Sequence, residues 1–219
     1  MAEKETRAER VYMGIRTDIL SGMRAPGDRL PTAEFCARFD TSVGVVREAL
    51  LRLAEHGLVQ VRPMQGFRVS ELTADDLRDL TEARLDIETL ALRYAVEQGD
   101  RDWEARVVGA HHLLSVAPQH SGDPAQRFTP EWGKAHGSFH TALLEGCRNR
   151  RILAAALRLR DSAELYRRWS VTADRHANRD LVAEHRELLD AALARDGAAA
   201  ADVLASHIRR TDEILRAHL

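Results

Sequence analysis

One short stretch of this chain has the pattern of β-strands, and sequence with a helical period lies on both sides of it. Residues 58–61 (LVQV) and 67–69 (FRV) are rich in the β-branched and aromatic residues that strands favour. The residues between them, RPMQG, predict a hairpin turn with glycine at its tip. We therefore expect a mainly α fold that contains a single small hairpin.

Three short helices are predicted before the hairpin. A helical period runs through residues 6–22, the segment 25–31 (APGDRLP) breaks it, and residues 32–39 follow with Thr32 as the expected N-cap. Ser42 is the expected N-cap of a third helix over residues 43–55. Three helices followed by a hairpin are the layout of a winged helix-turn-helix, which binds double-stranded DNA. The buried stripe of the third helix is predicted to be Val46, Ala49, Leu50 and Leu53.

From residue 74 onward the pattern is helical almost to the last residue. The sequence therefore predicts two domains, a winged helix-turn-helix at residues 1–73 and an all-α antiparallel helical bundle at residues 74–219. The longest irregular segment is residues 117–130. The predicted helices of the bundle cover residues 74–98, 100–117, 130–145, 149–170, 175–195 and 197–217.

Charge and hydropathy limit the partners that this chain can have. No apolar run approaches the roughly 20 residues of a membrane-spanning helix, and the N-terminal residues MAEKETRAER lack the apolar core of a signal peptide. We expect a cytoplasmic protein with no membrane partner. Residues 1–73 hold 11 basic and 10 acidic residues (+1), and the remainder holds 21 and 24 (−3). DNA binding must therefore depend on where single arginines lie rather than on bulk charge.

Several residues of the predicted winged helix-turn-helix are candidates for DNA contacts. Arg47 lies one turn into the third helix, where it can reach a guanine edge or a phosphate, although it could instead pair with a nearby acid. Ser42 and the first amides of that helix, including the amide of Gly44, can hold a phosphate because helix N-termini favour anions. The hairpin candidates for the DNA backbone or the minor groove are Arg62, Gln65 and Arg68.

Two histidines, His136 and His140, stand one helical turn apart on the apolar face of the predicted helix 130–145. His185 and His207 lie on the apolar faces of two other predicted helices. A buried imidazole must form hydrogen bonds or bind a metal, so these residues are either satisfied core histidines or a metal site. Neutral imidazole nitrogens suit zinc, nickel, cobalt or a similar divalent ion.

Arg84 shares the apolar face of the predicted helix 74–98. A buried arginine needs an anion. That anion is either an internal acid, for example Asp161 or Glu164, or the carboxylate of a small effector.

Residues 6–72 resemble the DNA-binding domain of GntR-type bacterial transcription regulators. The most specific pieces of this resemblance are VREALLRLAEHGLV and PMQGFRV. It implies that Arg47 contacts operator DNA and that Gln65 and Gly66 form the tip of the wing.

Residues 74–219 resemble the FCD-type ligand-sensing domain of the FadR-like branch of that family, in its smaller, six-helix form. The segments that carry the resemblance are TEARLDIETLALRYA, HGSFHTALLEGCRN, AEHRELLDAALARD and SHIRRTDEIL. In many such domains an aspartate and three histidines hold a divalent metal at the floor of an effector pocket. By this resemblance His140, His185 and His207 take the histidine places, and His136 stands where the aspartate usually is. An all-histidine set favours zinc or nickel.

These features predict a homodimeric transcription regulator, because an operator with two half-sites needs two reading heads. We expect a repressor whose operator affinity changes when a small carboxylate effector binds above the metal. One alternative is a regulator for which the metal ion itself is the signal. A metal-dependent hydrolase is a weaker alternative, because HGSFH has glycine where the zinc-protease pattern has its general base. We therefore expect no enzymatic activity.

Overall fold

The computed structural model describes residues 6–119, 128–169 and 179–216. Within these ranges the protein is mainly α-helical with one two-stranded antiparallel sheet, as the sequence predicts. The described residues divide into two compact units. The N-terminal unit extends to Thr73 and also includes Asp161–Trp169, and the helical unit contains Ala74–Arg160 and the described residues from 179 onward.

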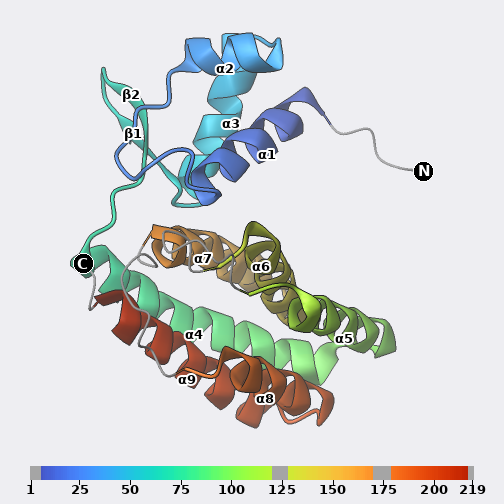
Figure 1. Ribbon diagram of the computed structural model, residues 1–219. Helices are drawn as coiled ribbons and strands as arrows, with labels where there is room; N and C mark the ends of the chain where they lie inside the picture. The colour runs from blue at the N-terminus through green and yellow to red at the C-terminus, as the bar shows by residue number, and fades with distance from the viewer. Residues whose placement is uncertain (1–5, 120–127, 170–178, 217–219) are drawn as a thin grey trace. The chain divides into compact units, whose positions relative to one another are not determined.

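The N-terminal unit consists of three helices and a hairpin around one apolar core (Figure 1). The four residues predicted as the buried stripe of α3 are all fully buried. Antiparallel pairing of the two strands places Val59 opposite Val69 and Arg62 opposite Gly66. Leu165 of α7 also belongs to this core. The elements are α1 (Arg7–Leu20), α2 (Thr32–Phe39), α3 (Val43–Glu55), β1 (Val59–Arg62) and β2 (Gly66–Val69).

Two local predictions in this unit need correction, and the prediction of Ser42 as the N-cap of α3 is confirmed in its position. Thr32 is not the N-cap of α2; Pro31 takes that position with an extended backbone, so Thr32 is already helical. Ser42 is the N-cap of α3, but its side chain makes no capping hydrogen bond. The tip of the hairpin lies before Gly66, because Met64 has a left-handed backbone (φ 59°) and is fully exposed, whereas Gly66 already pairs with Arg62.

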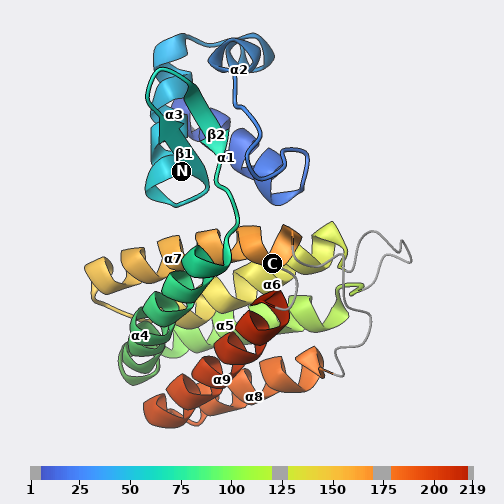
Figure 2. The same cartoon turned by 90° about the vertical axis from the view of Figure 1, so that its left-hand side faces the viewer.

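The helical unit packs α4 against α9 along their length, and α5 contacts both α6 and α8 (Figure 2). Trp103 shows how closely these helices approach: it is fully buried on α5 and donates its indole N–H to the carbonyl oxygen of Ala142 on α6 over 2.9 Å. The helices from residue 74 onward are α4 (Ala74–Gln98), α5 (Arg101–Val116), α6 (Pro130–Leu144), α7 (Arg150–Trp169), α8 (Leu181–Leu193) and α9 (Gly197–Arg216). The part of α7 from Asp161 onward belongs to the N-terminal unit.

The predicted helix 175–195 starts too early. Residues 175–178 lie outside the described ranges, and α8 begins only at Leu181 because Asp180 caps it by accepting a hydrogen bond from the amide of Ala183. The predicted irregular segment 117–130 is described only at its two ends. No described helix is both long enough and apolar enough to span a bilayer.

Candidate metal centre and DNA-contact residues

The four histidines singled out in the sequence meet inside the helical unit. His136 and His140 come from α6, His185 from α8 and His207 from α9, and all four are buried. When one ring nitrogen is taken from each histidine, these four nitrogens all lie within 4.8 Å of one another. The Nε2 atoms of His140 and His185 are 3.2 Å apart.

Local sequence places the two histidines of α6 on one face of that helix. Thr129 caps α6 by accepting from the amide of Trp132, and Pro130 opens its first turn, which sets the phase of the helix. The period of four residues then places His136 and His140 on the buried face. The Trp132 ring stacks on the His136 ring, with their centroids 4.8 Å apart.

The separations of the ring nitrogens fit a divalent ion. Zinc binds imidazole nitrogen at about 2.0–2.1 Å, so neighbouring ligands of a tetrahedral site lie about 3.3 Å apart and opposite ligands of an octahedral site about 4.2 Å apart. The 3.2 Å separation of the His140 and His185 nitrogens matches the tetrahedral value. The chosen nitrogens of all four histidines lie within 4.8 Å of one another, which exceeds the octahedral separation by less than about 1 Å.

Burial keeps these imidazoles in the form that binds metal. Removal from water lowers the pKa of His185 to about 3, and it lowers the pKa values of His140 and His207 as well. Positive charge adds to the effect, because Arg160 faces His140 and Arg179 faces His207. At neutral pH these three rings are therefore neutral and offer lone pairs.

Glu184 fixes which nitrogen of His207 is available. Its Oε2 lies 2.9 Å from His207 Nδ1, and a carboxylate can only accept, so Nδ1 carries the proton and Nε2 keeps its lone pair. Arg179 donates to both oxygens of the same carboxylate, over 2.8 and 2.6 Å, and Arg210 donates over 3.2 Å. Burial alone would raise the pKa of Glu184, but the bonds from His207 and Arg179 outweigh it and lower the pKa.

Arg84 does have an internal partner, and that partner is Glu88. The Arg84 Nε and a Glu88 carboxylate oxygen are 2.6 Å apart, and Arg160 lies 3.5 Å from the other oxygen. Glu88 is completely buried. The two acids suggested from the sequence are engaged elsewhere, Asp161 with Arg16 and Glu164 with Arg167.

Arg84 and Arg160 both contact the buried carboxylate of Glu88. Arg160 lowers the pKa of His140 and Arg84 lowers that of His207, so both guanidinium groups act on the histidine cluster. The sequence contained a signal for Glu88, which follows Arg84 by one helical turn. It contained none for Arg160, whose contact with Glu88 joins two helices.

The candidate DNA contacts lie at two places in the N-terminal unit. Ser42, Gly44 and Arg47 are exposed at the start of α3, and Arg47 makes no ion pair with any described residue. Its guanidinium lies 5.6 Å from the centre of the Phe67 ring on the hairpin.

The candidate DNA-contact residues of the hairpin differ in their exposure and in their contacts within the unit. Gln65 and Gly66 are exposed, and Arg62 is paired only with the exposed Glu71 over 3.4 Å. Arg68 instead donates to the carbonyl oxygen of Gly27 over 2.8 Å, so it supports the hairpin from within the unit.

Comparison with known proteins identifies this arrangement. Residues 7–69 match the model of the bacterial regulatory proteins of the gntR family, and residues 79–210 match the FCD domain. The chain belongs to the GntR family of bacterial regulatory proteins. It is 36% identical over 217 residues to the uncharacterized HTH-type transcriptional regulator BphR of Paraburkholderia xenovorans, covering 99% of this chain and 88% of BphR. It is 32% identical to the HTH-type transcriptional repressor GlaR of Escherichia coli, covering 90% of each chain.

Solved structures agree with this assignment. A GntR regulator from a Rhodococcus species superimposes with a TM-score of 0.76 at 26% identity, covering 97% of this chain and 99% of its own. The E. coli protein McbR shares the fold, with a TM-score of 0.79 at 24% identity and 96% and 97% coverage. This GntR-family chain is therefore a transcription regulator with an FCD domain, and the hydrolase alternative is wrong.

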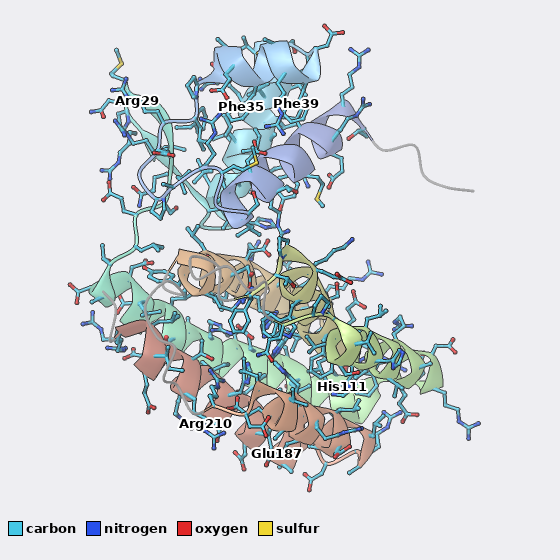
Figure 3. All side chains as sticks on the ribbon, in the orientation of Figure 1. Arg29, Phe35, Phe39, His111, Glu187 and Arg210 are labelled. Atoms are coloured by element: carbon cyan, nitrogen blue, oxygen red, sulfur yellow. The ribbon has the colours of Figure 1, made fainter. Side chains whose placement is uncertain are left out.

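Replacing Glu184 by glutamine should weaken metal binding while all four histidines remain. The amide can no longer act as an anionic acceptor for His207 Nδ1, so the ring loses both its orientation and part of its basicity. We expect the dissociation constant for zinc to rise about 10- to 100-fold, measured by competition with a chromophoric chelator. The matched control is Glu187→Gln on the exposed side of α8 (Figure 3), and equal affinity in the two variants would contradict the role of Glu184.

Replacing Arg47 by alanine should weaken binding to operator DNA. The DNA for this measurement is selected from a random library by binding to the wild-type protein. The loss expected for one bidentate contact is about 5- to 150-fold, or about 1–3 kcal/mol. The control is Arg52→Ala in the same helix, because Arg52 is held by Glu9 and by the Tyr12 ring. Unchanged affinity of the Arg47 variant by fluorescence anisotropy would exclude this residue from the interface.

Proposed function

We propose that this chain is a homodimeric transcription repressor controlled by a small carboxylate effector. Residues 1–73 bind the operator, and residues 74–219 bind the effector above a divalent metal, zinc or nickel, held by His136, His140, His185 and His207. The protein acts in the cytoplasm, where its DNA is. The observation that carries the proposal is the convergence of four buried histidines from three helices.

Repression and dimerisation are supported by the relatives and by the geometry of DNA recognition. The relative GlaR is named a repressor, and it matches over 90% of this chain. A single winged helix reads one half-site, so an operator with two half-sites requires two copies. In the N-terminal unit, Arg47, Arg62 and Gln65 are exposed and available for that contact.

A carboxylate is the effector class that the charges favour. The histidines bring no negative charge, and a divalent ion among them would add two positive charges close to the guanidinium groups of Arg84 and Arg160. The two buried acids of this region, Glu88 and Glu184, are already shared with arginines. A carboxylate ligand supplies the missing anion, and Arg84 is the residue we assign to it.

Control of DNA binding needs a difference in effector affinity between two conformations. In a repressor the effector binds more tightly to the conformation with the lower operator affinity, and the shift in the equilibrium cannot exceed that difference.

A regulator for which the metal is the signal is the second candidate. Four histidine ligands complete a tetrahedral zinc site without an open position. The 3.2 Å between the Nε2 atoms of His140 and His185 is close to the ligand–ligand separation of such a site. In that case the ion alone would change operator affinity.

The first test is the metal content of dialysed protein purified without a nickel column. We expect close to one zinc or nickel ion per chain, and loss of the ion in His140→Ala because one of four ligands is removed. His112→Ala, an exposed histidine on α5, is the matched control and should keep the ion. Elemental analysis that finds no metal in the wild-type chain would contradict the site.

The two candidates are separated by titrating metal and small carboxylates independently against operator binding. If a carboxylate is the signal, the metal-loaded protein binds operator and releases it only when the carboxylate is added. A change of operator affinity with metal alone, and none with carboxylates, would favour the second candidate and contradict the first.

A further inference from the structure

The first turn of α3 carries two residues that the packing of the N-terminal unit does not explain. Val43 is apolar and yet 53% exposed, and Gly44 is exposed beside it. Valine and glycine are both less favourable in a helix than alanine, so helix formation does not select them at exposed positions. The next residue, Val45, packs partly against the apolar core. Val43 is therefore the apolar side chain of this turn that is left largely to solvent.

Gly44 does not relieve crowding within the protein. A Cβ built there would have the Ser42 Oγ as its neighbour at 3.8 Å, which is an ordinary contact distance. Gly44 also lies inside the helix and is not among the glycines with a left-handed backbone. Glycine without such a requirement is used where the backbone approaches a bound molecule closely.

Val43 occupies a position from which bases are read. In a helix-turn-helix the helix after the turn lies in the major groove, and residues near its N-terminus contact base edges. Residues 7–69 match the gntR family, and α3 is the helix that follows α2 and the turn. Val43 is its first residue, and Arg47 follows four residues later, so the two exposed side chains are neighbours on the helix surface.

The chemistry of the major groove limits what Val43 can recognise. Base edges there present hydrogen-bond donors, hydrogen-bond acceptors and one apolar group, the 5-methyl group of thymine. The valine side chain can neither donate nor accept a hydrogen bond. The thymine methyl is therefore the group on a base edge that Val43 can contact without leaving a polar group unsatisfied.

We propose that Val43 contacts the 5-methyl group of a thymine in the operator, close to the contact made by Arg47. The inference rests on the proposed operator binding by residues 1–73 and names a base that this surface selects. Gly44 assists because the missing side chain lets the first turn of α3 lie close to the base edges. Burial of the two apolar groups against each other favours thymine at this base pair.

Uracil in place of thymine tests the contact, because it removes the methyl group and leaves the hydrogen-bonding edge of the base unchanged. The duplex is the operator selected from a random library by the full-length wild-type protein, and each of its thymines is replaced singly. We expect a thymine whose replacement weakens binding about fourfold, the value for one buried methyl group. Fluorescence anisotropy at constant salt concentration measures the dissociation constants.

The variant Val43→Ala should lose this sensitivity and bind the thymine and uracil duplexes within about twofold of each other. Val182→Ala on α8 is the matched control, because it shortens another exposed valine, and it should keep the fourfold difference. Circular dichroism and thermal unfolding check that both variants are folded. Folding should persist, because each replaced side chain is exposed and alanine favours a helix.

Gly44→Ala tests the close approach of the backbone. The fold has space for the added methyl group, so the variant should unfold at a temperature no lower than that of wild type. It should bind the operator less tightly, because the methyl group holds α3 away from the base edges. Undiminished operator binding by this variant would overturn the close approach.

The outcomes separate this contact from operator binding itself. A wild-type protein that selects no sequence from the library would overturn the proposed operator binding and, with it, this inference. A selected operator in which no uracil replacement weakens binding would overturn the inference alone. The same holds for a sensitivity to uracil that Val43→Ala retains in full.

Discussion

An imidazole loses its hydration when it is buried, and four of them meet in the core of the helical unit. The loss lowers the pKa of His185 to about 3 and removes the positive charge that would otherwise force these rings apart. Neutral rings still need a partner for each nitrogen. Glu184 provides one for His207, and the Nε2 atoms of His140 and His185 lie 3.2 Å apart. Without an ion, one of these two neutral rings can donate its N–H to the other, and a bound divalent ion would take both lone pairs instead.

The positive charge of a metal bound by the four histidines would need a compensating anion. A metal bound by neutral histidines alone would keep both of its positive charges, whereas an aspartate ligand would remove one. The compensating anion must then come from elsewhere, and the nearby acids Glu88 and Glu184 are already neutralised by arginines. The carboxylate effector that we propose would supply that anion.

The helical period was enough to predict much of the fold and the site. It placed His136 and His140 on the same buried face as Trp132, and it predicted the buried stripe of α3, because both depend only on positions within one helix. It could not reveal that Glu88 holds Arg84 and Arg160 together, since that contact depends on how two helices pack. The first residues of helices were predicted less well. The N-cap of α2 is Pro31 rather than Thr32, and the N-cap of α8 is Asp180, so α8 begins later than predicted.

The claim that a single ion is held by imidazoles alone can be tested directly by X-ray absorption spectroscopy of the full-length, zinc-reconstituted protein. Coordination by four histidines predicts one shell of nitrogen at about 2.0–2.1 Å, with the outer-shell scattering of imidazole rings. A shell containing sulfur at about 2.3 Å, or a shell of oxygen without imidazole scattering, would place the zinc elsewhere and contradict the assignment of this site.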